Sequence, residues 1–469
     1  MRKFFGTKEF YRNVFTIIIP IMVQQLFLSI AGYVDSLMIN SFGTPQGIAY
    51  NGVSAANRLV FILNFFFLGL TAAVSIFTSQ FFGANDRYKV RETARLSVYV
   101  SIIFGLIGSV VIAVFGKQVV NSYILDPIAR EYGYDYLNVM KYGIVFIALN
   151  MSFATSLRSI QKPTIPLYVG IVGILVNIFL NWIMIFGHFG CAPLGATGAA
   201  IATVISKIVE TIGYILIIKI KKFEMLDKMF KRFYISKSLL KDFIKRGTPI
   251  ALNELAFSLS MVIMTKFVTY QNDLWYNAYS YTQNITDLFF IVFSGLANGT
   301  QIIIGADLGT SNFDKAWKEQ KYFQGLGIMM GVTVGLLLML TAPLTSKMFT
   351  SNEESIKLMI KIMTVTGIFC GVYCYNSVNF FTLRAGGDSI RAVTLDQFPT
   401  YFVGLPIVII FGINATKLNL TVVELYLLSH ACDVVKILIG NIFISQKKWL
   451  KNLTTINNDT LLESELQSD

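Results

Sequence analysis

The stretch from 14 to 40, VFTIIIPIMVQQLFLSIAGYVDSLMIN, constrains the chain more than any other feature because it is long and almost wholly apolar. About 20 apolar residues are enough to cross a bilayer, so a helix over this stretch would span the membrane with some tilt. Further apolar runs of similar length follow along the whole chain. The sequence therefore predicts an all-α membrane protein with many spans.

The composition agrees with this class. The chain is 54% hydrophobic and 14% charged, whereas a soluble domain carries about 25% charged residues. A net charge of +12 would suggest a nucleic-acid partner in a soluble protein, but here the basic residues lie in loops on one side of the predicted membrane. We therefore expect a lipid bilayer as partner and no nucleic acid. Two histidines and four cysteines without a CxxC predict no structural metal site and no cofactor.

The apolar runs predict twelve transmembrane helices. Loops on one side, and both termini, carry many Lys and Arg, whereas loops 39–52, 188–195 and 271–275 carry none. By the positive-inside rule both termini are cytoplasmic, which predicts a multi-pass protein of the cell membrane. The predicted helices cover residues 14–38, 53–82, 95–116, 136–157, 164–187, 196–219, 244–270, 276–304, 322–345, 358–382, 394–412 and 421–445.

The two halves of the chain resemble each other. At an offset of 226 residues, Arg158 meets Arg384 and Asn150 meets Asn376, while PIMVQQL at 20–26 returns as PIALNEL at an offset of 229. Because six helices separate the halves, both begin on the cytoplasmic side, which predicts two six-helix lobes related by a parallel repeat. We expect an N-terminal lobe at 1–218, a basic cytoplasmic linker at 219–243, a C-terminal lobe at 244–448 and a disordered cytoplasmic tail at 449–469.

The two arginines matched by the repeat, Arg158 and Arg384, end their predicted helices on the cytoplasmic side. Cations at this depth suit contact with lipid headgroups, so we interpret both as anchors.

Asp35 lies a few residues from the outer end of the first predicted helix. An aspartate within a span costs roughly 2.5–3.5 kcal/mol at the centre on insertion scales, and less toward the ends. One interpretation is a carboxylate solvated by lipid headgroups. The other is a carboxylate that faces an internal cavity and binds Na⁺ or a proton, since burial favours the neutral form of an acid.

Two further acids lie within predicted helices of the second half. Glu254 follows Pro249, which loosens the hydrogen bonding of the nearby backbone, and it either bonds to another helix or couples an ion. Asp287 forms a polar patch with Gln283 on an apolar span. Such a patch faces a cavity or a partner helix in preference to lipid, and the two interpretations weigh equally.

Polar side chains also recur at helical spacing. Asn177 and Asn181 share one helix face, either to hydrogen-bond between helices or to supply neutral oxygen ligands near Asp35. Opposite charges three residues apart occur in both halves, with the signs exchanged at the offset of 226, and each pair would neutralise itself at depth. An alternative is that these pairs bond across the halves in one transport state. The pairs are Lys207 with Glu210 and Asp433 with Lys436.

Motifs of ATP hydrolysis, zinc proteolysis and serine hydrolysis do not occur in a suitable context, so we expect no enzyme activity. Abundant aromatic residues favour lipid-facing bulk and interfacial belts, although some, such as Tyr33, Phe153 and Trp182, would suit a cavity for flat organic cations.

An ordered set of motifs over most of the chain resembles the multidrug and toxic compound extrusion (MATE) family. The motifs are VDSLMINSFG after the first-helix proline, GANDR, SLRSIQKPTIP, VNIFLNWIMIFG, GATGAAIATVIS, PIALNEL and FFTLRAGGDS. The resemblance implies two six-helix lobes that open alternately to each side. It also implies that the protein is an antiporter, which carries out multidrug efflux of cationic or amphipathic organic compounds driven by Na⁺ or H⁺.

The resemblance also implies site residues. It places Asp35, Asn177 and Asn181, with Thr203 as a weaker addition, in an N-lobe cation site, and Glu254 at a C-lobe acid. The family often has aspartate where this chain has Asn181, which removes one charge and weakens Na⁺ binding relative to proton binding. The candidates for a substrate cavity are Asp287, Gln283, Gln25, Asn253 and Tyr33.

Three functions remain open on the sequence, besides a channel, against which the two-lobe repeat argues because it favours rocking about a central site. The first is a monomeric, ion-coupled exporter of small organic compounds. The second is a lipid-linked oligosaccharide flippase of the same superfamily, in which twelve helices and intramembrane acids are less expected. The third is a membrane scaffold or receptor, which has no need of intramembrane acids.

Overall fold

The computed structural model describes the whole chain except residues 1–3, 43–46, 222–225, 227–233 and 457–469. Within this part, twelve helical stretches are long and apolar enough to cross a membrane, which confirms the predicted all-α fold. The elements are α1 (Lys8–Asn40), α2 (Ile48–Gly83), α3 (Arg87–Tyr123), α4 (Pro127–Ser159), α5 (Thr164–Phe186), η2 (His188–Gly190), α6 (Gly195–Ile220), α7 (Lys237–Val268), α8 (Asp273–Gly309), α9 (Phe313–Phe349), α10 (Glu353–Ala385), α11 (Ser389–Pro399), η3 (Thr400–Gly404), α12 (Leu405–Ile413), α13 (Val422–Ser429), α14 (Ala431–Ser445) and α15 (Leu453–Ile456).

Several helices are longer than their apolar runs. The runs at 95–116 and 322–345 lie within α3 and α9, which begin at Arg87 and Phe313. Each of these helices is capped by the preceding side chain, because Asp86 accepts from the Lys89 amide and Asn312 from the Lys315 amide. Hydropathy therefore marks the part of the helix that suits the membrane, and the polar cap marks where the helix begins.

The internal repeat is visible in matching hydrogen bonds. Asn150 Nδ2 donates to the Lys207 carbonyl at 2.9 Å, and Asn376 Nδ2 donates to the Asp433 carbonyl at 2.9 Å. The second bond lies 226 residues after the first at both ends. The helix pairs α3 and α9, and α4 and α10, begin and end at the same offset. The repeat predicted from the sequence is thus present in helix bounds and in side-chain bonding.

The repeat fails at two neighbouring stretches of the second half. In place of a single helix at 394–412, α11 passes through the π-helical segment η3 into α12. In place of a single helix at 421–445, a turn at His430 separates α13 from α14. Pro399 and Pro406 lack the amide hydrogen that an α-helix needs, which accounts for the irregular backbone at η3.

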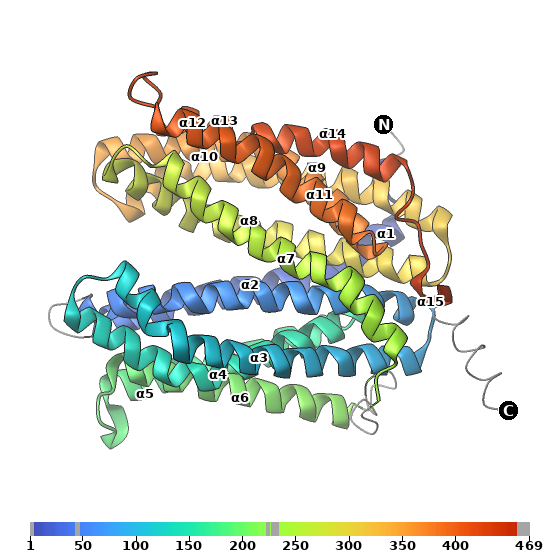
Figure 1. Cartoon of the computed structure of the whole chain (residues 1–469), viewed down its shortest axis with the longest axis horizontal. Helices are drawn as coiled ribbons and strands as arrows, with labels where there is room; N and C mark the ends of the chain where they lie inside the picture. The colour runs from blue at the N-terminus through green and yellow to red at the C-terminus, as the bar shows by residue number, and fades with distance from the viewer. Residues whose placement is uncertain (1–3, 43–46, 222–225, 227–233, 457–469) are drawn as a thin grey trace. The chain divides into compact units, whose positions relative to one another are not determined.

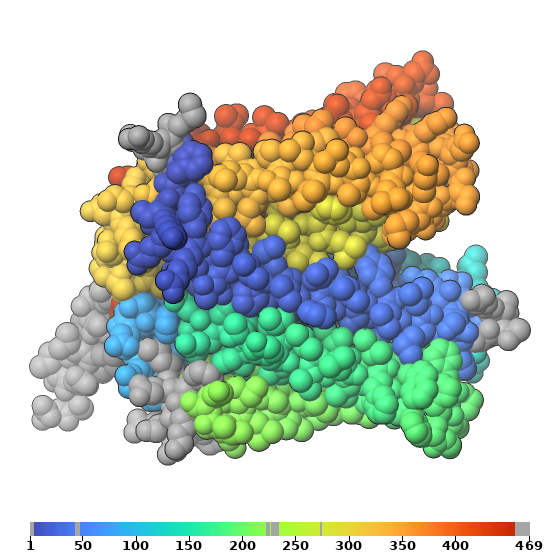
Figure 2. Space-filling view, turned by 180° about the vertical axis from the view of Figure 1, so that it is seen from behind, coloured from blue at the N-terminus to red at the C-terminus, as the bar shows by residue number. Residues whose placement is uncertain are grey.

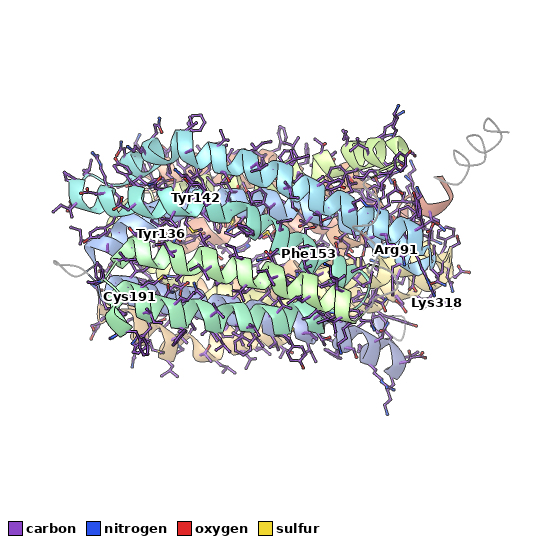
Figure 3. All side chains as sticks on the ribbon, turned by 90° about the horizontal axis from the view of Figure 1, so that it is seen from below. Arg91, Tyr136, Tyr142, Phe153, Cys191 and Lys318 are labelled. Carbon is purple, nitrogen blue, oxygen red and sulfur yellow. The ribbon has the colours of Figure 1, made fainter. Side chains whose placement is uncertain are left out.

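The chain divides into two compact units. The N-terminal unit contains residues 23–78 and 85–251, and the C-terminal unit contains 1–22, 79–84 and 252–469. In the N-terminal unit α4 packs against both α3 and α6 (Figure 1). Figure 3 places Arg91 and Cys191 at opposite ends of this unit's helices. The basic residues at the start of α3 and the loop 188–195, which carries no Lys or Arg, therefore lie at opposite ends.

In the C-terminal unit α10 packs against α8, α9 and α14, and its surface forms part of the orange face in Figure 2. The largest apolar core of this unit includes Phe10, Phe323 and Trp449. Trp449 is fully buried, and the amide of Leu453 donates to Gln80 Oε1 at 2.7 Å. Residues 449–456, which the sequence analysis assigns to the tail, therefore pack into this unit, while the rest of the tail lies outside the described residues.

The ends of α2 and α8 cross so closely that backbone touches backbone. A Cβ atom at Gly83 would lie 2.0 Å from the Ala306 carbonyl oxygen, and one at Gly309 would lie 1.9 Å from the Gln80 carbonyl oxygen. Ala306 and Gly309 follow Gln80 and Gly83 at the offset of 226, so the contact is reciprocal. Only glycine fits at either position without movement of the backbone.

We expect Gly83→Ala and Gly309→Ala each to destabilise the protein by about 1–3 kcal/mol, the usual cost of forcing extra atoms into a packed contact. The measurement is the midpoint of unfolding in mixed micelles. Gly32→Ala is the matched control, because nothing lies within 4 Å of a Cβ atom built there. Equal midpoints for all three variants would show that the crossing tolerates a methyl group.

Candidate functional site

The N-terminal unit brings Asp35 together with the asparagines predicted to lie near it. Asp35 is on α1, and Asn177 and Asn181 are on α5. Asn181 Nδ2 donates to Asp35 Oδ1 at 2.6 Å. When the amide nitrogen of Asn177 faces the acid, it lies 2.9 Å from Oδ1 and 3.2 Å from Oδ2, which avoids placing an amide oxygen against a carboxylate. Two amides from one helix therefore hold the Asp35 carboxylate.

Thr203 completes this cluster from a third helix. It lies on α6, and its Oγ1 is 3.4 Å from the amide end of Asn177. The hydroxyl donates to the Ala199 carbonyl at 2.9 Å, and with the Asn177 nitrogen turned toward Asp35 it is the amide oxygen of Asn177 that faces Thr203. The four residues named from the sequence as a cation site, Asp35, Asn177, Asn181 and Thr203, thus come from α1, α5 and α6.

The chemistry of this cluster suits a small cation. Asn181 is only 1% exposed, and its amide oxygen is buried without a hydrogen-bond partner. Hard cations prefer carboxylate, amide and hydroxyl oxygens, which are the groups present here. A proton needs fewer ligands than a metal cation, because it can bind to the Asp35 carboxylate alone. The donor set therefore fits either Na⁺ or H⁺ as a transported ion.

The residues proposed for a substrate cavity are more dispersed. In the N-terminal unit Gln25 is half-buried, and Tyr33 is 39% exposed on the same helix as Asp35. In the C-terminal unit Asp287 is exposed on α8, and Gln283 is half-buried one turn before it. The fifth, Asn253, is buried in a separate polar network of the C-terminal unit.

That network begins with Glu254 on α7. Arg384 NH1, on α10, donates to Glu254 Oε1 at 3.1 Å. The Arg384 side chain is 1% exposed, and its guanidinium lies 4.7 Å from the ring centre of Phe381. The interpretation of Arg384 as a headgroup anchor is therefore wrong. Its position in the last turn of α10 is covered, because the next turn packs against the Trp449 backbone at Gly386.

The matching arginine of the first half also turns to a partner inside its unit. Arg158 NH2 donates to Gln24 Oε1 at 2.5 Å, and Gln24 Nε2 donates to the Pro166 carbonyl at 3.1 Å. The repeat thus keeps an arginine at both places but gives it a neutral partner in one half and an acid in the other.

A second acid of the C-terminal network is Asp396, on α11. Its Oδ1 accepts from Lys436 Nζ at 2.8 Å, and its Oδ2 accepts from Gln397 Nε2 at 2.9 Å and Asn253 Nδ2 at 3.2 Å. Asp433, in turn, lies 2.7 Å from the Nδ1 atom of His430. The predicted pair of Asp433 with Lys436 is therefore wrong, because each has taken another partner. The pair of Lys207 with Glu210 is confirmed, at 2.9 Å.

Asp396 and His430 are site residues that were not predicted from the sequence. Asp396 lies near the start of an apolar run, as Asp35 lies near the end of one, and the same reasoning would have found it. His430 is one of two histidines, and the sequence argument considered it only as a metal ligand. Its place in a helix break is not signalled by a glycine or proline beside it.

Comparisons with known proteins show what the chain is similar to. The family model MatE matches residues 20–183 and 249–410, more than half of the chain. The uncharacterized transporter YisQ of Bacillus subtilis is 27% identical over 86% of this chain and 88% of its own length. The probable multidrug resistance protein NorM of Thermotoga maritima is 21% identical over 85% of each chain.

Solved structures show the same fold. The crystal structure of MATE in complex with MaL6 superposes with a TM-score of 0.82 at 21% identity, covering 94% of this chain and all of that one. The two matched segments of the family model also begin at Pro20 and Pro249, the prolines that open the repeated motif. The chain therefore belongs to the MatE family of multi-pass membrane transporters.

Proposed function

We propose that the chain is a secondary antiporter of the cell membrane that exports organic cations or amphipathic compounds in exchange for Na⁺ or H⁺. The single observation that carries this proposal is the Asp35 cluster, in which a carboxylate on a membrane-spanning helix is held by two amides. An intramembrane acid marks an ion or proton pathway in most proteins that have one. Relatives named as multidrug resistance proteins support the substrate class.

The cluster suggests how one ion is bound and released. Without an ion, the amide N–H groups of Asn177 and Asn181 donate to the Asp35 carboxylate. When Na⁺ enters, rotation of an amide by half a turn presents its oxygen to the ion in place of its nitrogen. When a proton enters, the protonated carboxyl donates to the same oxygen. Both ions neutralise the charge of the Asp35 carboxylate.

Other parts of the proposal follow from the sequence. The distribution of basic loops supports cytoplasmic termini, and export from the cytoplasm then follows from the antiport of an inwardly directed ion. Exposed Tyr33 and Asp287 offer an aromatic face and a negative charge to an organic cation. We expect the chain to act as a monomer, because both halves of the repeat are within one chain.

The flippase alternative is not favoured. Two relatives that match this chain over most of their own length are named as probable multidrug resistance proteins. The Asp35 cluster, whose residues best match the site that the family resemblance implies, is built around an acid and not a base. An anionic lipid-linked sugar would gain nothing from it.

We expect Asp35→Asn to reduce ethidium efflux at least tenfold, because the amide can neither bind a proton nor contribute charge to a Na⁺ site. The measurement is dye retention in cells that lack their main efflux pumps, at matched expression, with and without Na⁺. Asp135→Asn is the control, since Asp135 is exposed on α4. Undiminished efflux by Asp35→Asn would reject this site as the coupling site.

We expect Asn181→Asp to strengthen Na⁺ binding about tenfold, because a second carboxylate adds charge to the ligand set. Binding of radioactive Na⁺ to the purified protein at alkaline pH measures this without transport. Asn138→Asp, at an exposed position of α4, controls for added surface charge. If both variants bind Na⁺ as the wild type does, Asn181 does not face the ion.

A further inference from the structure

The turn between α13 and α14 holds an imidazole in a closely defined setting. His430 Nδ1 lies 2.7 Å from Asp433 Oδ2, and the ring stacks on Phe369 with centres 4.4 Å apart and planes 13° apart. Tyr426 meets the same ring edge-on at 4.9 Å. The bond to a carboxylate assigns the neutral ring's hydrogen to Nδ1. Nε2 is then a lone pair, and it is buried without a partner.

The charges around this ring are unbalanced by one. The polar network of the C-terminal unit contains three acids, Glu254, Asp396 and Asp433, and two bases, Arg384 and Lys436. With a neutral His430 the network carries a formal charge of −1, and with a protonated His430 it carries none. A group of buried charges is most stable when it is neutral, so the network favours the uptake of one proton.

The same positions of the N-terminal unit lack this arrangement. At the offset of 226, His430 corresponds to Val204 and Asp396 to Gly170, while Asp433 corresponds to Lys207. The backbone differs in the same place, because α5 and α6 are unbroken where the C-terminal unit has η3 and the turn at His430. The helices with irregular backbone are those that carry Asp396 and His430. Irregular turns inside helices occur often at functional sites.

We propose that His430 and Asp433 form a proton-binding site in the C-terminal unit, additional to the Asp35 cluster. A proton from water binds Nε2, the imidazolium keeps its bond from Nδ1 to Asp433, and the charge of the network changes from −1 to zero. The side chain of His430 is 17% exposed, although Nε2 itself is buried. Its use in transport rests on the proposed function, whereas the binding of the proton does not.

Every element packed around the ring contributes groups that bear on this site. The charged groups are Asp433 and Lys436 on α14 and Asp396 on α11. Among neutral titratable groups, Tyr426 on α13 meets the ring, Tyr279 on α8 and Cys370 on α10 lie near Tyr426, and Cys432 on α14 bonds to the Ser429 carbonyl. Asp433 is the charged group that bonds to the imidazole and is therefore the group to change.

The sequence makes a direct test simple, because it contains only two histidines. His188→Gln leaves His430 as the single imidazole of the full chain. In protein labelled with ¹⁵N-histidine and held in phosphatidylcholine nanodiscs, we would record the ring signals from about pH 5 to 8 and expect them to move as one proton binds. We expect Asp433→Asn, made in the same background, to weaken this proton binding about tenfold. Asp135→Asn is the matched control and should leave it unchanged.

Signals that stay constant across this range would overturn the proposal, and so would equal titrations with and without Asp433. Ethidium efflux separates it from the proposed function. Asp35→Asn should abolish efflux and leave the His430 titration intact, while His430→Gln should change the pH profile of efflux at matched expression. If the wild-type chain exports no ethidium but His430 titrates with dependence on Asp433, the proposed function fails and the proton site stands.

Discussion

A charge buried in a membrane protein must have an opposite charge or several hydrogen-bond partners within reach, since the cost of removing one ion from water is several kcal/mol. This requirement accounts for much of the interior described here. Arg384 reaches Glu254, Lys436 reaches Asp396, and Lys207 reaches Glu210. Each contact joins polar groups that would otherwise be expelled from the helical packing. The pairs Arg384 with Glu254 and Lys436 with Asp396 each join two helices and so constrain their positions, whereas Lys207 and Glu210 lie on one helix.

The sequence was sufficient to locate the twelve spans and the repeat, because both depend on local patterns, but it did not predict the break at η3 or the turn at His430. Apolar runs locate the spans, and the offset of 226 appears in loops whose capping residues are short and recognisable. Asp126 and Asn352, for example, cap α4 and α10 in the same way. The Asp35 cluster could also be anticipated, since two asparagines at helical spacing match the family pattern.

The ion-pair partners of the buried charged side chains could not be predicted from the sequence in the same way. Lys436 is three residues from Asp433, and spacing alone favours that pair, yet a neighbouring helix offers Asp396 at better geometry. Arg384 ends its helix, and hydropathy places it near the interface, but the segment around Trp449 covers that turn. Both errors have one cause. A periodic sequence pattern indicates which side chains share one face of a helix. It does not indicate which other segment packs against that face.

The buried arginine of the C-terminal unit has a consequence for how such a chain can evolve. Among the residues that the structure describes, two of its nitrogen atoms, Nε and NH2, have no hydrogen-bond partner, and the acid to which it bonds is Glu254. A lineage that loses the acid first passes through an intermediate with a stranded cation, whereas one that first replaces the arginine strands only an acid, which a proton can neutralise. The order of substitutions is therefore not free. Descendants of this chain that have lost the pair should have lost the arginine before the glutamate.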